Sequence, residues 1–461
     1  MKKFRIFSFV LILCLVFSCA VPTAFALEEP DIQAAAAVLV DLDSGRILYA
    51  KNMDEARAPA SLTKVMTVLL TLEAIDRGEA SMDDMVTAQD DCRQGMDESS
   101  STSGIMPGTV VSLRELLYCA LLQSANEACN IIGTHLAGSI SAFVDRMNAK
   151  AQELGCANTH FANPNGLTAE NHYSSAYDLY LITRAAIEHP DFLTMCNTLS
   201  YQPESSGVNG GEEMHNSNAL LTDRSVYGSN YLYEYASGVK TGYTRAAGYC
   251  LISTASKEDI HALAVVLGCD GALNAGLEEY RNFSSTISLY DWAFDGFSYQ
   301  TVLSTAEQVQ RVDVELAQDG RQAILRAQKD VTLLLPKDID ESAVTTSVTV
   351  YDDRLTAPIA AGTVLGEARI LIDGEEYATV SLINSSNVEL ARAEYFKIQL
   401  AKVFSNRWVI GIAIAVLVFL IGYFALVIRY RRLRRRHLRQ RKLAEKRRRE
   451  QQMARDYNGR H

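Results

Sequence analysis

The sequence predicts a mixed α/β fold of the α+β type, in which an antiparallel sheet packs against helices. A small all-β domain and one transmembrane helix follow it. Three observations lead to this prediction. Apolar residues recur at helical spacing in the first half of the chain, three strand-like segments follow one another between residues 238 and 269, and residues 408–428 contain no charge. The chain has 461 residues, which is enough for two or three domains.

The N-terminus, residues 1–26, has the composition of a secretory signal peptide. A basic start, MKKFR, precedes the apolar run IFSFVLILCLVF, and AFA ends at Ala26 as a small-residue cleavage site. A membrane anchor is one alternative, but the apolar run is short for an anchor. Lipoprotein processing at Cys19 is another, and it is disfavoured because Phe17 stands where a small residue is expected.

The C-terminus predicts a single membrane span. Residues 408–428, WVIGIAIAVLVFLIGYFALVI, are 21 residues long, which at 1.5 Å per residue matches a hydrocarbon core of roughly 30 Å. The tail, residues 429–461, then contains 15 Lys and Arg against 3 Asp and Glu. Positive charge beside a span stays cytoplasmic, so we expect the tail inside the cell membrane and the body outside it.

The charge distribution bears on possible partners. The net charge is -11, but residues 27–428 alone contain 26 basic and 52 acidic residues. Such an acidic body argues against nucleic-acid binding. Nucleic-acid binding by the basic tail is the more specific alternative. We favour instead a tail that sets the membrane topology and contacts the lipid surface.

The elements follow in order. Residues 34–52 predict two strands joined by a turn at Asp43-Ser44-Gly45, and a helix then runs to about Gly78. Residues 95–108 predict a loop, and Ser112 with Glu115 forms a capping box that opens a second helix. A helix at 177–187, strands at 238–242, 248–256 and 261–269, and a long closing helix at 273–294 complete the domain.

The character of the chain changes near residue 305, where short strands alternate with turn residues. An amphipathic segment then leads into the predicted span. We therefore divide the chain into a signal peptide (1–26), a main domain (27–304), a β-rich domain (305–390), a juxtamembrane segment (391–407), a membrane helix (408–428) and a basic tail (429–461).

The segment Pro59–Leu70, PASLTKVMTVLL, places a lysine at the start of an otherwise apolar helix. Positions three apart lie on one helix face, so Lys64 can point at Ser61. Burial and the positive end of the helix would lower the pKa of Lys64, which would let its amine take the Ser61 proton and create a nucleophile. The alternative is a capping serine beside a lysine that reaches solvent, because S-x-x-K alone is a weak motif.

The segment Ser124-Ala125-Asn126 interrupts the apolar pattern where two helical runs meet. The Ser124 hydroxyl there can pass protons and the Asn126 amide can hold a substrate amide. An ordinary helix-break cap explains the same residues equally well.

The segment Lys240-Thr241-Gly242 lies in an extended stretch. Lys240 and Thr241 offer a cation and a hydroxyl to a substrate carboxylate, and Gly242 lets a substrate backbone approach closely. The three motifs in this order, after a signal peptide, are much more specific than any one of them.

The set S-x-x-K, S-x-N and K-T-G resembles the penicillin-binding proteins and serine β-lactamases. The segments PASLTKVMT, NPNGL, HYSSAYDL and KTGYTRAAGYC are similar to the low-molecular-mass D-alanyl-D-alanine carboxypeptidases of serine peptidase family S11, and LTAPIAAGTVLGE is similar to their C-terminal β-domain. The resemblance covers roughly Ala34–Leu390 and implies a penicillin-binding/β-lactamase-like fold.

The resemblance implies roles that agree with those argued from the residues. Ser61 would be acylated, with Lys64 as its base, and the backbone N–H groups of Ser61 and Tyr243 would form the oxyanion hole. Two departures from the pattern are Tyr243, where relatives often have histidine, and Ala125, where they usually have glycine. Neither removes a reacting group. His172 matches a family histidine, and we interpret it as structural.

We therefore expect a membrane-anchored carboxypeptidase that removes the last D-alanine from peptidoglycan stem pentapeptides and is acylated by β-lactams. The histidines and cysteines show no metal-ligand spacing, so we expect neither a metal nor a cofactor. A β-lactamase is one alternative, although no clear E-x-x-x-N occurs in the middle region. A catalytically silent wall-binding protein is another, which the intact Ser61, Lys64 and Lys240 disfavour.

Overall fold

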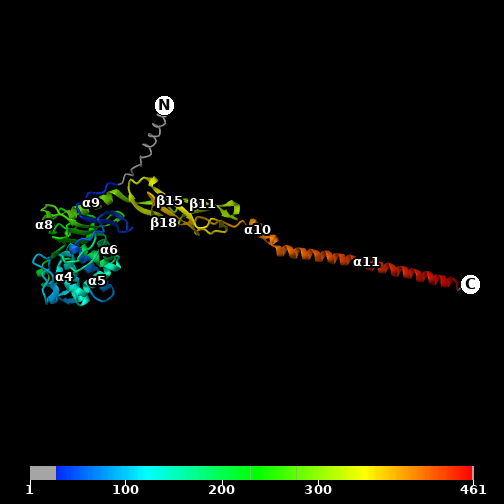
Figure 1. Cartoon of the computed structure of the whole chain (residues 1–461), viewed down its shortest axis with the longest axis horizontal. Helices are drawn as coiled ribbons and strands as arrows, with labels where there is room; N and C mark the ends of the chain where they lie inside the picture. The colour runs from blue at the N-terminus through cyan, green and yellow to red at the C-terminus, as the bar shows by residue number, and fades with distance from the viewer. Residues whose placement is uncertain (1–26, 229, 277, 459–461) are drawn as a thin grey trace, which may run out of the picture. The chain divides into compact units, whose positions relative to one another are not determined.

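The computed structural model describes residues 27–228, 230–276 and 278–458 (Figure 1). The predicted signal peptide, residues 1–26, lies outside the described residues. By its internal contacts the chain forms two compact units. The first contains the described residues up to Val302 together with Thr332–Val344, and the second contains Leu303–Val331 and the residues from Thr345 onward.

A five-stranded antiparallel sheet forms the centre of the first unit, with strand order β2-β1-β9-β8-β7. Its strands are β1 (Ala36–Asp41), β2 (Ile47–Lys51), β7 (Ala236–Thr244), β8 (Gly248–Lys257) and β9 (Ile260–Cys269). Every residue of β1 is buried, and its side chains alternate between two apolar cores, one on each face of the sheet. The predicted hairpin and the three later strands are confirmed.

Helices cover both faces of this sheet. One core contains the apolar residues of α2 (Lys64–Asp76), α3 (Leu113–Leu122), α4 (Asn126–Ala137), α5 (Ile140–Glu153), α6 (Ala176–Ile187) and α7 (Pro190–Cys196). The other core contains those of α9 (Arg281–Gly296), which contacts β8 and β9. The prediction of an antiparallel sheet packed against helices is confirmed.

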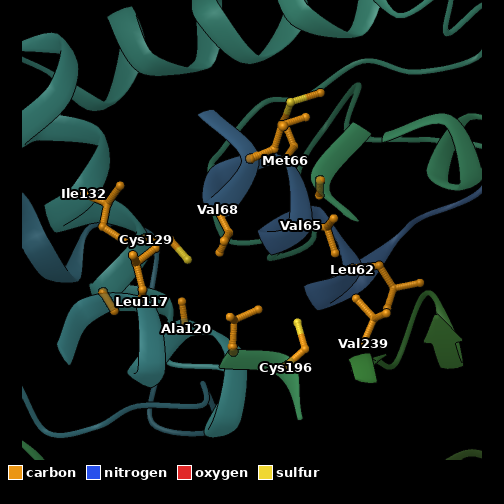
Figure 2. Packing of buried hydrophobic residues seen from close by; sticks show 14 of the residues in the cluster. Leu62, Val65, Met66, Val68, Leu117, Ala120, Cys129, Ile132, Cys196 and Val239 are labelled. Carbon is orange, nitrogen blue, oxygen red and sulfur yellow. The ribbon is translucent and has the colours of Figure 1, made fainter. Parts of the chain in front are cut away.

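The helix α2 is buried on nearly all sides, with ten of its 13 residues buried. Figure 2 shows Val68 of α2 directed toward Leu117 of α3 and Ile132 of α4, whereas Val65 lies toward Leu62 and Met66 points away from α3 and α4. A helix that is apolar all round belongs in a core, as the sequence indicates. Its N-terminus continues from a short 3₁₀ turn, η1 (Ala60–Thr63).

One local prediction is confirmed and another needs correction. Ser112 caps α3 by accepting a hydrogen bond from the Glu115 N–H at 3.2 Å, but the Glu115 carboxylate also accepts hydrogen bonds from the backbone N–H groups of Glu204 and Ser205. The closing helix begins at Arg281, not near residue 273. Gly276 has φ +65°, a left-handed conformation that ends the short helix α8 (Ala272–Ala275) before α9 starts.

The remaining elements of the first unit are short. They are β3 (Met85–Thr87) paired with β4 (Val110–Ser112), η2 (Asp90–Arg93), β5 (Ser200–Tyr201) paired with β6 (Met214–His215), and η3 (Asn209–Gly211). The strand β10 (Phe297–Leu303) pairs with β14 (Val331–Pro336) in a two-stranded sheet. Six cysteines of the described chain have unpaired thiols: Cys92, Cys119, Cys129, Cys156, Cys196 and Cys250.

The second unit contains the predicted all-β module. A five-stranded sheet has the order β11-β13-β18-β17-β15. Its strands are β11 (Gln310–Val312), β13 (Ala323–Ala327), β15 (Val344–Val350), β17 (Val364–Ile372) and β18 (Glu375–Asn384), and β12 (Val314–Glu315) pairs with β16 (Leu355–Thr356). The 3₁₀ turn η4 (Gln318–Gly320) also belongs to this unit, whereas the 3₁₀ turn η5 (Glu341–Ala343) lies in the first unit.

Two helices end the described chain. The helix α10 (Arg392–Ser405) has no buried residue, and α11 (Arg407–Asn458) follows it as one element of 52 residues (Figure 1). Of the helices in the described ranges, one is long and apolar enough to cross a membrane, and it begins at Arg407. The predicted span, residues 408–428, lies within α11, which by length and composition is a candidate membrane anchor.

Candidate active site

The start of the buried helix brings Ser61 and Lys64 together. Ser61 lies in the 3₁₀ turn η1 and Lys64 is the first residue of α2. Residues three apart are eclipsed in a 3₁₀ turn, so the two side chains point the same way. Lys64 Nζ lies 2.9 Å from Ser61 Oγ, and Lys64 is fully buried while Ser61 is partly exposed. This contact is the one that the S-x-x-K spacing predicts.

Lys64 Nζ has two further partners, and both are neutral acceptors. They are the side-chain Oδ1 of Asn126 at 2.8 Å and the backbone carbonyl of Asn165 at 2.6 Å. A neutral amine has two N–H groups and one lone pair. If the two N–H groups serve Asn126 and Asn165, the lone pair is left facing the Ser61 hydroxyl, which is the arrangement that a base requires.

Burial lowers the pKa of the two lysines near the site. The pKa of Lys64 falls from 10.5 to about 8, because burial disfavours the charged amine. The pKa of Lys240 falls to about 7, first because of burial and then because of the positive charge of Lys64. A substantial fraction of Lys64 is therefore neutral near physiological pH, and it can accept a proton.

A loop of residues 162–167 holds the start of α2 in place. The Thr67 hydroxyl donates to the Pro164 carbonyl at 2.6 Å, and the Asn165 carbonyl accepts from Lys64. Gly166 packs so tightly that an added Cβ would lie 1.9 Å from the Ala60 carbonyl oxygen. Glycine is required there both for this approach and for its φ of +90°.

His172 joins the same loop to η1. Its Nδ1 accepts a hydrogen bond from the Ala162 N–H at 3.0 Å, so its proton is on Nε2, which lies 2.9 Å from the Thr63 hydroxyl. Burial lowers the pKa of His172 to about 4, so the ring is neutral at physiological pH. These contacts hold the loop against η1, which agrees with the structural role that we infer for His172 from the sequence.

The segment Ser124–Asn126 forms a second wall of the site. Ser124 has φ +58° and lines the same pocket as Ser61, and its buried Oγ has no hydrogen-bond partner among the described residues. Asn126 is buried at the start of α4, where its Oδ1 accepts from Lys64 and its Nδ2 donates to the Ser101 carbonyl at 3.0 Å. Both ends of this amide are occupied here, so its role in holding a substrate amide stays a prediction.

The third wall is β7, which is the last strand of the sheet. A Cβ on Gly242 would lie 3.2 Å from Ser61 N, so the glycine lets the strand itself approach η1. Thr241 Oγ1 lies 2.8 Å from Ser217 Oγ, and the Tyr243 ring packs against Tyr249 with centroids 4.4 Å apart. Lys240 is 1% exposed, and its Nζ donates to the Thr241 carbonyl at 2.9 Å.

These walls enclose a pocket of about 470 Å³. Of the predicted site residues, Ser61, Ser124, Thr241, Gly242 and Tyr243 line it, whereas Lys64, Asn126 and Lys240 lie behind its surface. Among the described residues there is no group of three His, Cys, Asp or Glu side chains that could hold a metal ion.

Sequence reasoning missed several residues of the pocket and its support. Ser217, Glu213, His215 and Arg224 line the pocket, and Asn165 supplies a carbonyl to Lys64. The NPNGL segment contains Asn165, so a signal for that loop exists in the sequence. Of the other four, His215 lies in the two-residue strand β6 and the rest in irregular stretches; none belongs to a motif, and only the fold brings them to the site.

A serine hydroxyl in contact with a buried lysine amine at a pocket wall is the arrangement of the class of serine hydrolases that use lysine as a base. Comparison with known proteins narrows this class. Residues 23–271 match the D-alanyl-D-alanine carboxypeptidase family, peptidase family S11, and residues 297–390 match the C-terminal domain of penicillin-binding protein 5. The chain belongs to the D-alanyl-D-alanine carboxypeptidase family.

Individual relatives agree with this assignment. The chain is 33% identical to D-alanyl-D-alanine carboxypeptidase DacF of Bacillus subtilis over 366 residues, covering 77% of this chain and 88% of DacF. It is 32% identical to DacA of Escherichia coli over 353 residues, covering 75% of this chain and 81% of DacA.

Solved structures share the fold. Penicillin-binding protein 5 from Haemophilus influenzae has a TM-score of 0.59 at 28% identity and covers 79% of this chain and 100% of its own. Penicillin-binding protein 6B from Escherichia coli has a TM-score of 0.60 at 28% identity and covers 78% and 98%. The predicted penicillin-binding/β-lactamase-like fold with its C-terminal β domain is therefore confirmed.

Proposed function

We propose that the protein is a serine-type D-alanyl-D-alanine carboxypeptidase that removes the terminal D-alanine from peptidoglycan stem pentapeptides. The observation that carries this proposal is the 2.9 Å contact between Ser61 Oγ and the buried Lys64 Nζ, whose other two partners are neutral. Membership of the carboxypeptidase family supports the choice of substrate.

The proposed reaction has two steps. Ser61 attacks the penultimate D-alanine carbonyl while Lys64 accepts its proton, and the backbone N–H groups of Ser61 and Tyr243 stabilise the oxyanion. D-Alanine leaves after its amine takes the proton that Lys64 accepted, and water then hydrolyses the acyl-enzyme and frees Ser61. The covalent intermediate replaces one high barrier by two lower ones, and each oxyanion donor contributes roughly 3 kcal/mol.

The remaining site residues have supporting roles in this proposal. Ser124 passes protons, which accords with its buried hydroxyl that has no partner among the described residues. Asn126 orients Lys64 in the resting enzyme and holds the substrate amide. Lys240 and Thr241 bind the terminal carboxylate, and Gly242 lets the β7 backbone come close to the reaction centre.

We also propose a place in the cell for each part of the chain. Residues 1–26 are a signal peptide, 27–304 the carboxypeptidase domain, 305–390 a β-rich spacer and 391–407 a juxtamembrane segment. Residues 408–428 cross the cell membrane once and 429–461 form a cytoplasmic tail. The 21 uncharged residues followed by a run of arginines support this topology.

A fluorescent penicillin tests the function. Stable covalent labelling of the wild-type protein, absent in Ser61→Ala, together with release of D-alanine from a stem pentapeptide, is the expected result. Labelling that turns over within seconds would instead indicate a β-lactamase. If correctly folded protein is not labelled and releases no D-alanine, the result would indicate a silent wall-binding protein.

A further inference from the structure

The pocket contains a charged corner that the proposed mechanism does not use. Arg224 is the one lysine or arginine among the described residues that line the pocket, and its side chain is 66% exposed. Lys240, by contrast, is 1% exposed and its Nζ already donates to the Thr241 carbonyl. A ligand anion that enters the pocket therefore meets Arg224 as its accessible cation.

A chain of contacts connects the residue next to Arg224 to β7. The hydroxyl of Ser225, the next residue, donates to the Ser217 carbonyl at 2.7 Å. The Ser217 hydroxyl in turn lies 2.8 Å from Thr241 Oγ1. Arg224 and Thr241 line the same pocket, and Thr241 carries the hydroxyl that the proposed function assigns to the substrate carboxylate.

Glu213 opposes this cation. Its Oε2 lies 3.8 Å from an Nη1 of Arg224 and 3.9 Å from His215 Nε2, and the other carboxylate oxygen accepts from the Ser200 hydroxyl. At 3.8 Å the arginine is held loosely, without the short paired contacts of a bidentate ion pair. A ligand carboxylate can therefore replace Glu213 as the partner of Arg224. The negative charge of Glu213 repels the ligand carboxylate as it approaches.

We propose that Arg224 is a specificity-determining residue that selects peptides ending in a free carboxylate, with Glu213 as its partner in the empty site. This inference rests on the proposed function, because it assigns the terminal carboxylate of the same substrate to an additional residue. The carboxylate contacts the Thr241 hydroxyl and the Arg224 guanidinium together, while Lys240 acts from beneath the surface. A C-terminal amide or ester loses the arginine contact and is a poor substrate.

The test compares charge variants of the full-length protein on two matched pairs of ligands. The variants are Arg224→Gln, Glu213→Gln and, as a control, Arg245→Gln, which removes an exposed arginine just after β7 that does not line the pocket. One ligand pair is an acylated tripeptide ending in D-Ala-D-Ala and its C-terminal amide. The other pair is benzylpenicillin and its methyl ester. The rate at which each acylates the enzyme is measured as the loss of subsequent labelling by fluorescent penicillin.

Arg224→Gln should lower kcat/KM and the acylation rate for the free carboxylates by about tenfold, the usual effect of one charged hydrogen bond at an exposed site, and change those for the neutral ligands less than about twofold. Glu213→Gln should raise the rates for the free carboxylates by about twofold to threefold, because it removes a repelling charge. Arg245→Gln should leave the ratio between charged and neutral ligands unchanged.

Two results would overturn the inference. One is an unchanged ratio between charged and neutral ligands in Arg224→Gln, where an equal loss on both indicates a structural role. The other is a changed ratio in Arg245→Gln. Either result leaves the proposed function standing as long as the wild-type protein releases D-alanine and is labelled. Absence of both in the wild type is a failure of the proposed function itself.

Discussion

Lys64 Nζ and Asn126 Oδ1 lie 2.8 Å apart, and both residues are buried in the first unit. The amide offers oxygen but no negative charge, so it orients the amine without stabilising its charged form as a carboxylate would. In the proposed mechanism, this relationship and the pKa of about 8 leave Lys64 able to act as the base.

Replacing Asn126 by aspartate should therefore weaken acylation. A carboxylate beside Lys64 stabilises the ammonium and raises the pKa of Lys64 by about one unit or more. The neutral fraction at pH 7 then falls by about tenfold or more, and the acylation rate should fall with it. The measurement is the rate of labelling by a fluorescent penicillin. Asn171→Asp, on an exposed turn, is the control, and equal rates in wild type and Asn126→Asp would contradict the role of Lys64.

The pH dependence of acylation should follow Lys64. The amine must be neutral to accept the proton, and its pKa is about 8, so the rate rises with pH and levels off above about 8. Below that value the rate should fall about tenfold per pH unit. His172 should not contribute near neutrality, because its pKa is lowered to about 4. The maximal acylation rate at saturating penicillin, measured from pH 5.5 to 9.5, tests this, and a flat profile from pH 6 to 9 is incompatible with it.

Gly166→Ala should destabilise the protein and disturb the site. The new Cβ would lie 1.9 Å from the Ala60 carbonyl oxygen, and the residue also keeps a φ of +90°. Gly138→Ala is a matched control, since Gly138 has φ +79° but an added Cβ there meets nothing within 4 Å. The control should lose about 1 kcal/mol of unfolding free energy from backbone strain. Gly166→Ala should lose about 1–3 kcal/mol more from overpacking.

Thermal unfolding and penicillin labelling of both glycine variants provide the readout. The melting temperature of Gly166→Ala should fall below that of Gly138→Ala, and labelling should be impaired only in Gly166→Ala. Equal melting temperatures would mean that the loop and η1 are not packed as described.

The C-terminal topology can be tested in cells. Protease added to intact cells should remove the main domain and leave the arginine-rich tail protected, because positive charge beside a span stays in the cytoplasm. Deleting the residues from Arg407 onward should release the protein from the membrane fraction. Digestion of the tail in intact, unlysed cells would reverse the proposed orientation.

Much of the fold was predictable because its signals are local. The hairpin of β1 and β2, the strands β7 to β9 and the buried helix α2 follow from turn residues and from apolar runs of characteristic length. The closing helix was misplaced because the apolar residues around Leu273 suit a helix, while the left-handed Gly276 interrupts it. That conformation depends on backbone angles which a glycine permits but does not dictate.

The site was predictable in so far as its residues share a motif. Ser61 and Lys64 are three residues apart, so helical geometry alone brings them together. The Asn165 carbonyl is 101 residues from Lys64 along the chain, and Arg224 is 17 residues from Thr241 on a loop without regular structure. Contacts of this kind are set by tertiary packing, which a periodic pattern in one segment does not encode.

The position of β7 at the end of its sheet has a consequence for the ligands this protein accepts. A terminal strand presents main-chain donors and acceptors to whatever lies alongside it. A peptide that pairs with this edge strand is recognised by its extended backbone, because nearly every residue type supplies the same amide groups. Side chains of the peptide substrate that precede the cleaved bond should therefore vary without much loss of activity. Selectivity should depend mainly on the carboxyl end of the peptide.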